Sequence, residues 1–201
     1  VQFFAIYLNK ALLGKPFLNT LKYIDFFYDQ MYKYGHIINT VSKYEDIIIN
    51  KSINKMSAIL TVEGGAALEG KISNLISLYE LGVRLVTLTW NDRNCIGDGV
   101  SVQFGKGLST FGKDVVKKMN ELGIIIDVSH LNILGFWDVY ELSQKPFVAS
   151  HSNAFAITPN KRNLNDEQIR AISCRGGVIG INMYKDFVSQ NAVAKVEDLL
   201  S

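Results

Sequence analysis

The sequence predicts a parallel α/β fold, and more specifically a (β/α)8 barrel. Short apolar runs alternate along the chain with longer amphipathic stretches, as in folds where each strand is followed by a helix. Polar side chains of metal-binding types stand at the carboxyl ends of several runs. A doubly wound sheet shows the same alternation, but in a barrel these ends meet on one rim, where active sites are built. The position of the polar residues therefore favours the barrel.

Six apolar runs are the predicted strands. Each is rich in Val, Ile, Leu or Phe over about four to eight residues. None has a polar face, which is typical of strands buried on both sides. The runs are Val1–Leu8, Ser57–Val62, Arg84–Thr89, Gly123–Val128, Pro146–Ala149 and Gly177–Met183.

Three of the intervening stretches have a spacing that predicts helices. In Leu68–Leu81, apolar residues recur at steps of three and four, and a glycine follows where the helix should end. Asp114–Leu122 shows the same pattern and is also closed by a glycine. Asn163–Cys174 has acidic residues in its first turn, with Asn163 or Asn165 available as the N-cap.

Length and composition predict one domain over residues 1–201. The chain is 48% hydrophobic and has no composition break, internal repeat or linker. Barrels of this kind need about 250 residues, so we expect an incomplete barrel domain. The sequence begins at Val1 with a strand-like run, and it has neither an initiator Met nor the charged first segment of a signal peptide. We therefore expect residues to be missing at the N-terminus, and the lack of a leader suggests the cytoplasm.

Several classes of partner are disfavoured. The net charge is +2, from 21 basic and 19 acidic residues, and no basic stripe suggests nucleic-acid binding. No apolar run reaches the roughly 18 residues that a membrane span needs. Cys95 and Cys174 fit no C-x-x-C pattern, and two free thiols are favoured over a disulfide.

Three residues at predicted strand ends are candidate metal ligands. Glu63 follows the second run and precedes two glycines, while His130 and His151 follow the fourth and fifth runs. Carboxylate and imidazole groups are ligands that zinc accepts. Each has a structural alternative, namely a capping carboxylate or a packed imidazole. Two of the three histidines at successive strand ends favour the metal site, whereas His36, in the aromatic and predicted helical stretch Met31–Ile38, is interpreted as structural.

Other polar residues fall near the same rim. Trp90 and Asn91 follow the third run, and Asn182 falls within the sixth. Asp127 precedes His130 by three residues, so it either orients an imidazole or simply packs at the strand end. Arg162, taken alone, fits a solvated loop.

At these positions the sequence resembles the membrane (renal) dipeptidase family of zinc peptidases. The resemblance covers nearly the whole chain, and the separation of His130 and His151 is the one that the family uses. Its segments, in order, are Thr61–Gly65, Leu78–Thr89, Ile126–His130, Ser150–Ala154 and Lys161–Asn163.

The resemblance implies a barrel of the metal-dependent hydrolase type that holds two zinc ions in its complete site. Glu63 matches the carboxylate that bridges the two metals, and His130 and His151 match the ligands of the second metal. Arg162 matches the arginine that holds the substrate and its developing negative charge. The implied reaction is hydrolysis of a dipeptide by a water that bridges the metals.

The sequence departs from the family pattern in three places. A His-x-Asp pair on the first strand and an aspartate on the eighth have no counterpart, so we expect strands two to seven only. We also expect at most one well-held zinc ion and poor catalysis by this chain alone. Some members place a substrate-contacting His after the fourth strand; here Trp90 and Asn91 stand there, and they are the predicted substrate contacts.

Two other functions stay open from the sequence. The first is a catalytically inactive metal-binding or interaction protein on the same barrel. The second is a related metal-dependent amidohydrolase that acts on other amides, lactones or phosphodiesters. A homodimer is compatible with the resemblance, although no residue specifies it, and the preferred dipeptide and its stereochemistry are not determined.

Overall fold

A computed structural model describes residues 1–191 and 193–199 of the protein. It contains a sheet in the order β1-β3-β4-β5, and β2 pairs with the first residues of β3. All pairings between these strands are parallel, as predicted. The strands are β1 (Gln2–Tyr7), β2 (Ile38–Thr40), β3 (Met56–Glu63), β4 (Val83–Thr87) and β5 (Ile125–Asp127).

The last two predicted strands continue this sheet but are much shorter than expected. Pro146–Ala149 and Gly177–Met183 are represented by single parallel bridges, Asp127 to Val148 and Ala149 to Ile179. The chain leaves the sheet after Ala149 because the next backbone N–H, that of Ser150, donates to the Asp127 carboxylate at 2.9 Å. Along β1-β3-β4-β5 and these two bridges, the order of the strands in space follows their order in the sequence, and β2 stands off this path.

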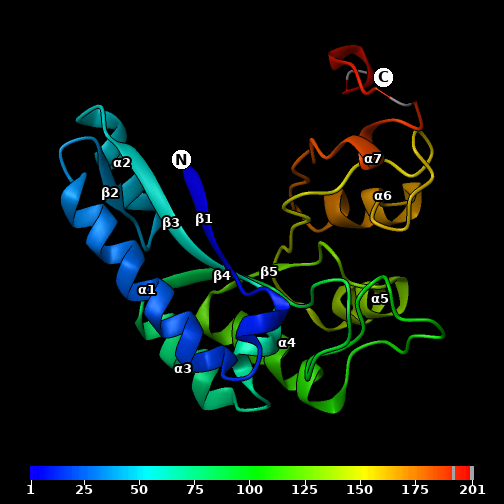
Figure 1. The fold of residues 1–201 in the computed structure, drawn as a ribbon, viewed down its shortest axis with the longest axis horizontal. Coiled ribbons are helices and arrows are strands. Elements are labelled where there is room, and N and C mark those ends of the chain that lie inside the picture. Colours follow the sequence, from blue (N-terminus) through cyan, green and yellow to red (C-terminus); the bar gives the residue numbers. More distant parts are fainter. Residues whose placement is uncertain (192, 200–201) are drawn as a thin grey trace.

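Helices lie around the outer side of the strands (Figure 1). Most of them contribute apolar side chains to one core that they share with the sheet. The helices are α1 (Pro16–Lys33), α2 (Tyr44–Ser52), α3 (Ile72–Glu80), α4 (Thr110–Leu122), α5 (Ile133–Leu142), α6 (Asp166–Cys174) and α7 (Lys185–Val188), with 3-10 turns at Lys10–Leu12, Gly65–Leu68 and Val196–Leu199.

Two helices begin at other residues than the sequence predicts. The stretch Leu68–Leu81 is not one helix, because Glu69 adopts a left-handed conformation (φ +50°) that separates the 3-10 turn from α3. α4 begins earlier than predicted because the Ser109 hydroxyl accepts a hydrogen bond from the Gly112 N–H at 2.9 Å. For α6, Asn165 is the N-cap, as one of the two alternatives proposed.

The stretch Met31–Ile38 is not helical throughout. Its first residues end α1, and Ile38 opens β2, so the chain turns between them. His36 lies exposed in this turn, where its ring approaches that of Tyr34 at 6.5 Å between centroids.

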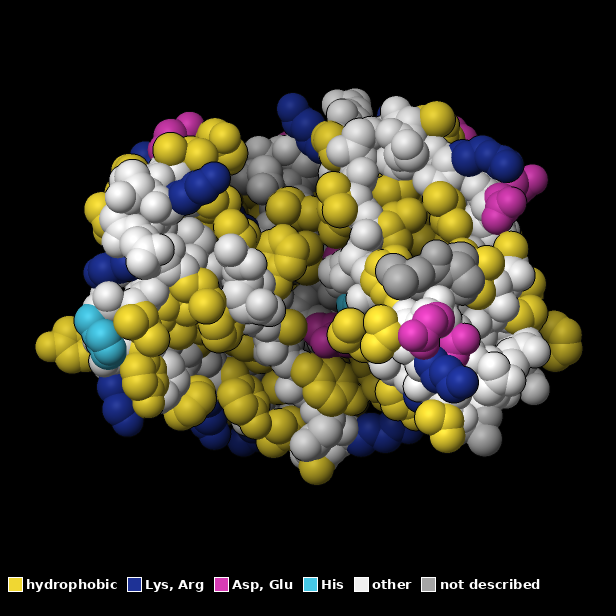
Figure 2. Space-filling view, turned by 90° about the horizontal axis from the view of Figure 1, so that it is seen from above, with side chains coloured by type: hydrophobic (Ala, Val, Ile, Leu, Met, Phe, Trp, Pro, Cys, Tyr) yellow, Lys and Arg dark blue, Asp and Glu magenta, His cyan; other side chains and the backbone are white. Residues whose placement is uncertain are grey.

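The two borders of the sheet expose apolar side chains, so the expectation that all strands are buried on both sides is wrong. β1 pairs only with β3 among the described strands, and Phe3 is 43% exposed. Near the opposite border, Val178 and Ile181 are 68% and 59% exposed. Figure 2 shows a hollow between the two sides, lined by hydrophobic side chains, with an acidic group and a histidine at its bottom. Across the described residues the sheet is therefore an open arc.

No helix within the described ranges is long and apolar enough to cross a membrane. Cys95 and Cys174 are both free thiols.

Candidate metal centre

Glu63, His130 and His151 come together at the carboxyl ends of the strands. Their ligand atoms all lie within 4.8 Å of one another. Glu63 Oε1 is 3.2 Å from His130 Nε2 and 3.6 Å from His151 Nε2, and the two Nε2 atoms are 2.8 Å apart. A carboxylate and two imidazoles that converge on one point are a suitable donor set for zinc.

The backbone at Glu63 is shaped by the two glycines that follow. Gly64 has φ +98°, a conformation that other residues rarely adopt. A Cβ on Gly65 would stand 2.1 Å from the Cδ1 atom of Ile96, so this position cannot carry a side chain without displacing the core. The glycines thus turn the chain sharply away from the end of β3 and leave the Glu63 carboxylate at the rim.

His130 also has a left-handed backbone, with φ +69°. Such strain in a residue other than glycine is uncommon and often occurs at functional sites. Here it turns the imidazole towards Glu63 and His151. Trp90 packs against the His130 ring, with 5.6 Å between centroids and 30° between planes.

Hydrogen bonds at the outer nitrogens determine which nitrogen of each imidazole carries the proton. His130 Nδ1 is 2.7 Å from the Asn91 amide oxygen, an acceptor, so Nδ1 must donate. His151 Nδ1 is 2.7 Å from the Ser150 hydroxyl, which gives its own proton to Asp127 Oδ2 at 2.6 Å. The hydroxyl must therefore accept from Nδ1. Both neutral imidazoles consequently direct an Nε2 lone pair at the same point, as metal-binding histidines do.

Asp127 is the anchor of this arrangement and is fully buried. Besides the Ser150 hydroxyl, its carboxylate accepts from the Thr87 hydroxyl at 2.6 Å and the Ser129 N–H at 3.0 Å. It thus reaches His151 through Ser150 and does not contact His130 through any hydrogen bond that we observe among the described residues. A role in orienting an imidazole, one of the two alternatives, is consistent with this geometry and stays a prediction.

The protonation states suit a cation. Burial raises the pKa of Glu63, but the contact with His130 and the positive charge that His151 and His130 carry when protonated outweigh it and lower that pKa below its ordinary value. Burial lowers the pKa of both His130 and His151, more than the neighbouring carboxylates raise it. At neutral pH the site therefore holds an ionised carboxylate and two neutral imidazoles.

Asn91 and Trp90, the predicted substrate contacts, both touch His130 in the structure. Their side chains support the imidazole from its Nδ1 atom and from its face. Trp90 also meets Tyr7 of β1, with 5.4 Å between ring centroids. Contact with a substrate stays a prediction for both residues. Asn182 lies beside His151: its Nδ2 atom donates to the His151 carbonyl at 3.5 Å, and its backbone N–H donates to Asn153 Oδ1 at 2.8 Å.

Arg162 is buried beside the three candidate ligands and is only 5% exposed, so the reading of a solvated loop is wrong. Its Nη2 atom donates to the His151 carbonyl at 3.2 Å, whereas its Nε atom has no hydrogen-bond partner. Burial lowers the pKa of Arg162 to about 10, although Asp127 and Glu63 raise it, so the guanidinium is charged at neutral pH.

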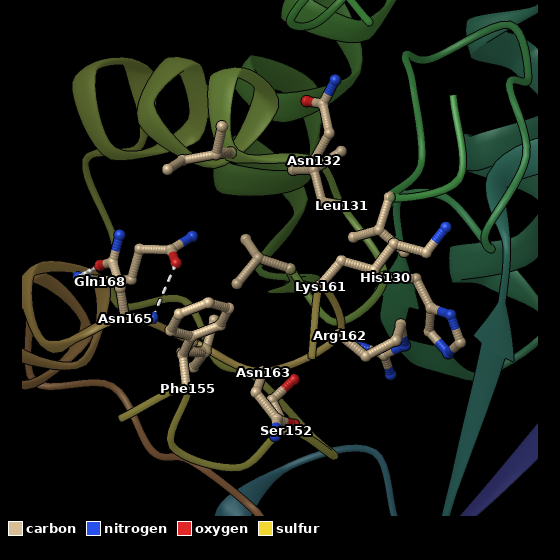
Figure 3. A pocket seen from close by; sticks show the side chains of 14 residues that line it. His130, Leu131, Asn132, Ser152, Phe155, Lys161, Arg162, Asn163, Asn165 and Gln168 are labelled. Atoms are coloured by element: carbon tan, nitrogen blue, oxygen red, sulfur yellow. Dashed lines mark hydrogen bonds between the residues drawn. The ribbon is translucent and has the colours of Figure 1, made fainter. Parts of the chain in front are cut away.

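A cavity of about 360 Å³ opens next to this guanidinium. His130 and Arg162 stand at one end, and Asn165 and Gln168 at the other (Figure 3). Its volume is within the range of small-molecule sites.

Sequence reasoning missed Ser150 and Ser129, which connect Asp127 to His151, and Thr87, which donates to Asp127. The hint was the run of hydroxyl residues next to each histidine, but hydroxyl side chains at strand ends are too common to mark a site by themselves. The hydrogen-bond partner of each hydroxyl depends on the three-dimensional contact between β4, β5 and the chain after Ala149.

The model of the membrane dipeptidase family, peptidase family M19, matches residues 1–201. The chain belongs to this family. It is 30% identical, over 94% of its length, to an uncharacterized dipeptidase of Schizosaccharomyces pombe, and 40% identical over 66% of its length to an uncharacterized protein of Klebsiella pneumoniae. It spans about half the length of these relatives, 49% and 51% respectively.

Solved structures of metallopeptidases are similar as well. Dipeptidase AC, described as a family M19 metallopeptidase, superposes with a TM-score of 0.90 at 27% identity over 98% of this chain and 64% of that chain. A metallopeptidase from Rhodobacter sphaeroides was solved with a phosphinate mimic of the dipeptide L-Ala-D-Ala. It superposes with a TM-score of 0.76 at 30% identity, over 81% of this chain and 49% of that chain. The M19 fold is a barrel of the metal-dependent hydrolase type. The described residues of this chain form an open part of such a barrel, with a parallel sheet and helices outside it.

Proposed function

We propose that this chain carries one zinc site of a metal-dependent dipeptidase, with Glu63, His130 and His151 as the metal ligands. Membership of family M19 supports a metallopeptidase. Zinc is proposed because a carboxylate and two imidazoles match its preferences in ligand type and number. The complete catalytic site is proposed to hold two zinc ions, bridged by Glu63, of which this chain holds one.

The observation that carries this proposal is the approach of two Nε2 atoms to 2.8 Å while both Nδ1 atoms donate outwards. Without a cation, two lone pairs and a carboxylate oxygen would face one another with no proton between the imidazoles. A divalent cation at that point accepts all three. The hydrogen bonds to Asn91 and Ser150 hold the rings for this purpose and do not satisfy the inner nitrogens.

Arg162 is proposed to bind the dipeptide carboxylate and to stabilise negative charge that develops on the scissile carbonyl. Its planar group offers several donors, and Nε is still free. A metal held by Glu63, His130 and His151 would supply a Lewis acid that polarises the carbonyl and lowers the pKa of the attacking water. Asp127, through Ser150, keeps the His151 ring oriented during this step.

The test is a pair of substitutions in an intact parent chain that completes the barrel. Glu63→Ala removes a metal ligand, and we expect loss of bound zinc together with loss of dipeptide hydrolysis. Glu80→Ala, at an exposed position on α3, is the matched control and should keep both. Retained hydrolysis in Glu63→Ala would refute the assignment, and a substrate panel that favours lactones or other amides over dipeptides would replace the proposed substrate.

A further inference from the structure

Four planar side-chain rings form a line of contacts that ends at the candidate metal ligands. Tyr7 lies 5.4 Å from Trp90, and Trp90 lies 5.6 Å from His130, measured between ring centroids. His130 lies 4.8 Å from His151 by the same measure. These separations are all within the range of interacting aromatic pairs. The ring of Tyr7, on β1, is therefore connected through one indole to both imidazoles.

The strand register places Tyr7 beside the third ligand as well. In the parallel pairing of β1 with β3, Tyr7 is the register partner of Glu63. Tyr7, Glu63 and Trp90 also line the same small cavity, of about 70 Å³. The indole and its tyrosine neighbour thus border the space next to the carboxylate.

The backbone that carries Trp90 is held by the loop that follows it. The Val100 N–H donates to the His130 carbonyl at 2.9 Å, which connects this loop to the ligand. A Cβ on Gly99 would stand 2.0 Å from the Trp90 carbonyl oxygen, so this position cannot carry a side chain without displacing the Trp90 backbone. The indole therefore extends from a backbone that is fixed relative to His130.

A stacked ring restrains His130 in a way that its hydrogen bond does not. The contact of Nδ1 with the Asn91 amide oxygen, at 2.7 Å, fixes one atom of the imidazole but lets the plane of the ring tilt about that atom. The indole of Trp90 lies at 30° to this plane and limits the tilt. The backbone of His130, with φ +69°, is in an uncommon conformation that persists only where surrounding contacts enforce it.

The stack also depends on the charge of the imidazole. An imidazole whose Nε2 lone pair is held by a cation becomes electron-poor. The face of an aromatic ring is negative, and the face of an indole attracts positive groups more strongly than that of phenylalanine or tyrosine. The contact between Trp90 and His130 is consequently stronger when His130 holds a metal ion, and this difference raises the affinity for the metal.

We infer that Trp90 is a positioning residue of the metal centre, whose indole fixes the plane of the His130 ring and favours the metal-bound imidazole. Tyr7 acts one step further out, because its ring packs against the indole. The inference rests on the proposed function for the identity of the bound ion, but the ring stack itself is present without the metal. It requires no contact between Trp90 and a substrate.

The first experiment compares two replacements of Trp90 by titration with Co²⁺, whose visible absorption reports the geometry of its ligands. Trp90→Phe keeps an aromatic face, whereas Trp90→Leu keeps only apolar bulk. We expect the Co²⁺ dissociation constant to rise about fivefold in Trp90→Leu and about twofold or less in Trp90→Phe. The absorption band should shift only in the leucine variant. Trp137→Leu, on α5, removes the other tryptophan of the chain and should change neither quantity.

Two results of this comparison would overturn the inference. Equal losses of affinity in Trp90→Leu and Trp90→Phe would show that an aromatic face is not what His130 needs. A lower free energy of unfolding in Trp90→Leu, with unchanged Co²⁺ affinity and absorption, would show that the indole is only structural.

Tyr7 gives a second matched pair. Tyr7→Phe removes the hydroxyl and keeps the ring, so we expect the Co²⁺ dissociation constant to stay the same. Tyr7→Leu removes the ring that supports the indole, and the constant should rise by about twofold. Equal constants in Tyr7→Leu and the unmodified chain would contradict the function inferred for Tyr7.

NMR of the metal-free chain tests the stack separately from the metal. The ring current of the indole shifts the imidazole C–H resonances of His130, and we expect these resonances to move in Trp90→Leu while those of His36 stay in place. Unmoved His130 resonances would overturn the inference. An unmodified chain that binds no Co²⁺ would refute the metal site and the positioning role together, whereas Co²⁺ binding that is insensitive to Trp90 would refute the positioning role alone.

Discussion

At the scale of single residues, each candidate histidine ligand has a partner at its outer nitrogen: the Asn91 amide oxygen accepts from His130 Nδ1, and the Ser150 hydroxyl accepts from His151 Nδ1. Glu63, His130 and His151 stand at strand ends, and parallel strands bring such ends together, so their meeting was predictable. The contact of Asn91 with His130 was not predictable, because the direction of a side chain after the end of a strand depends on the turn that follows. In the structure it faces His130 Nδ1.

Ser150→Ala tests the support of His151. This change removes the acceptor of the Nδ1 proton and separates the imidazole from Asp127. We expect zinc affinity to fall by about 10- to 100-fold, the usual effect of losing a partner of a metal-bound histidine. Competition with a zinc-binding dye measures this change. Ser173→Ala, exposed on α6, is the control, and equal affinity in both variants would show that Ser150 does not position the ring.

At the scale of elements, the strands were predicted better than the helices. Apolar runs of strand length are visible without any further information, and four of the six correspond to β1, β3, β4 and β5. Helix α5 was missed because apolar residues occur also on its exposed face, as at Ile133 and Leu134, which hides its periodicity. The break after Leu68 depends on the left-handed conformation of Glu69, which the residue type does not indicate.

The beginning of α4 gives a prediction on stability. Ser109→Ala removes the side-chain acceptor for the Gly112 N–H, and N-cap losses of this kind cost about 1 kcal/mol. Urea unfolding followed by circular dichroism should show this decrease. Thr110→Ala, the adjacent exposed position, should change the free energy of unfolding much less. Equal effects would mean that the cap does not stabilise the helix.

The loop between β4 and α4 gives a prediction on pH. The hydrogen bond with Arg93 lowers the pKa of Asp98, and the Lys106 N–H, at 2.7 Å, acts in the same direction. A carboxyl with a lowered pKa stabilises the fold fully above its unfolded pKa of about 3.9, and this stabilisation is lost as the pH falls through the folded value. Asp98→Asn should therefore reduce stability at pH 6, and the difference should become smaller as the pH falls below the unfolded pKa. A difference between the two proteins that is independent of pH would contradict this account.

At the scale of the whole molecule, the arc has two apolar borders. Phe3 lies on one, and Ile181 and Met183, 59% and 79% exposed, lie near the other. The polar residues at the strand ends predicted a barrel, but the exposure of these borders could not be predicted from the sequence, since a buried strand and a border strand have the same apolar composition.

Because of these borders, we expect the 201-residue chain to self-associate. Contiguous exposed apolar surface favours association, so we expect binding of the dye ANS and self-association in sedimentation velocity. Replacing Phe3 and Ile181 together by Thr should reduce both signals. Replacing Tyr32 and Tyr44, which are exposed on α1 and α2 away from the borders, should reduce them less. An unmodified chain that stays monomeric and binds no dye would contradict the prediction.

The most direct test of the metal centre is native mass spectrometry of the chain after dialysis against zinc. We predict one zinc ion per chain, which is lost in His151→Ala but kept in His36→Ala, because His36 is exposed and distant in sequence and fold from the ligands. A chain that binds no zinc, or that loses zinc equally in both variants, would contradict the assignment of Glu63, His130 and His151 as a metal site.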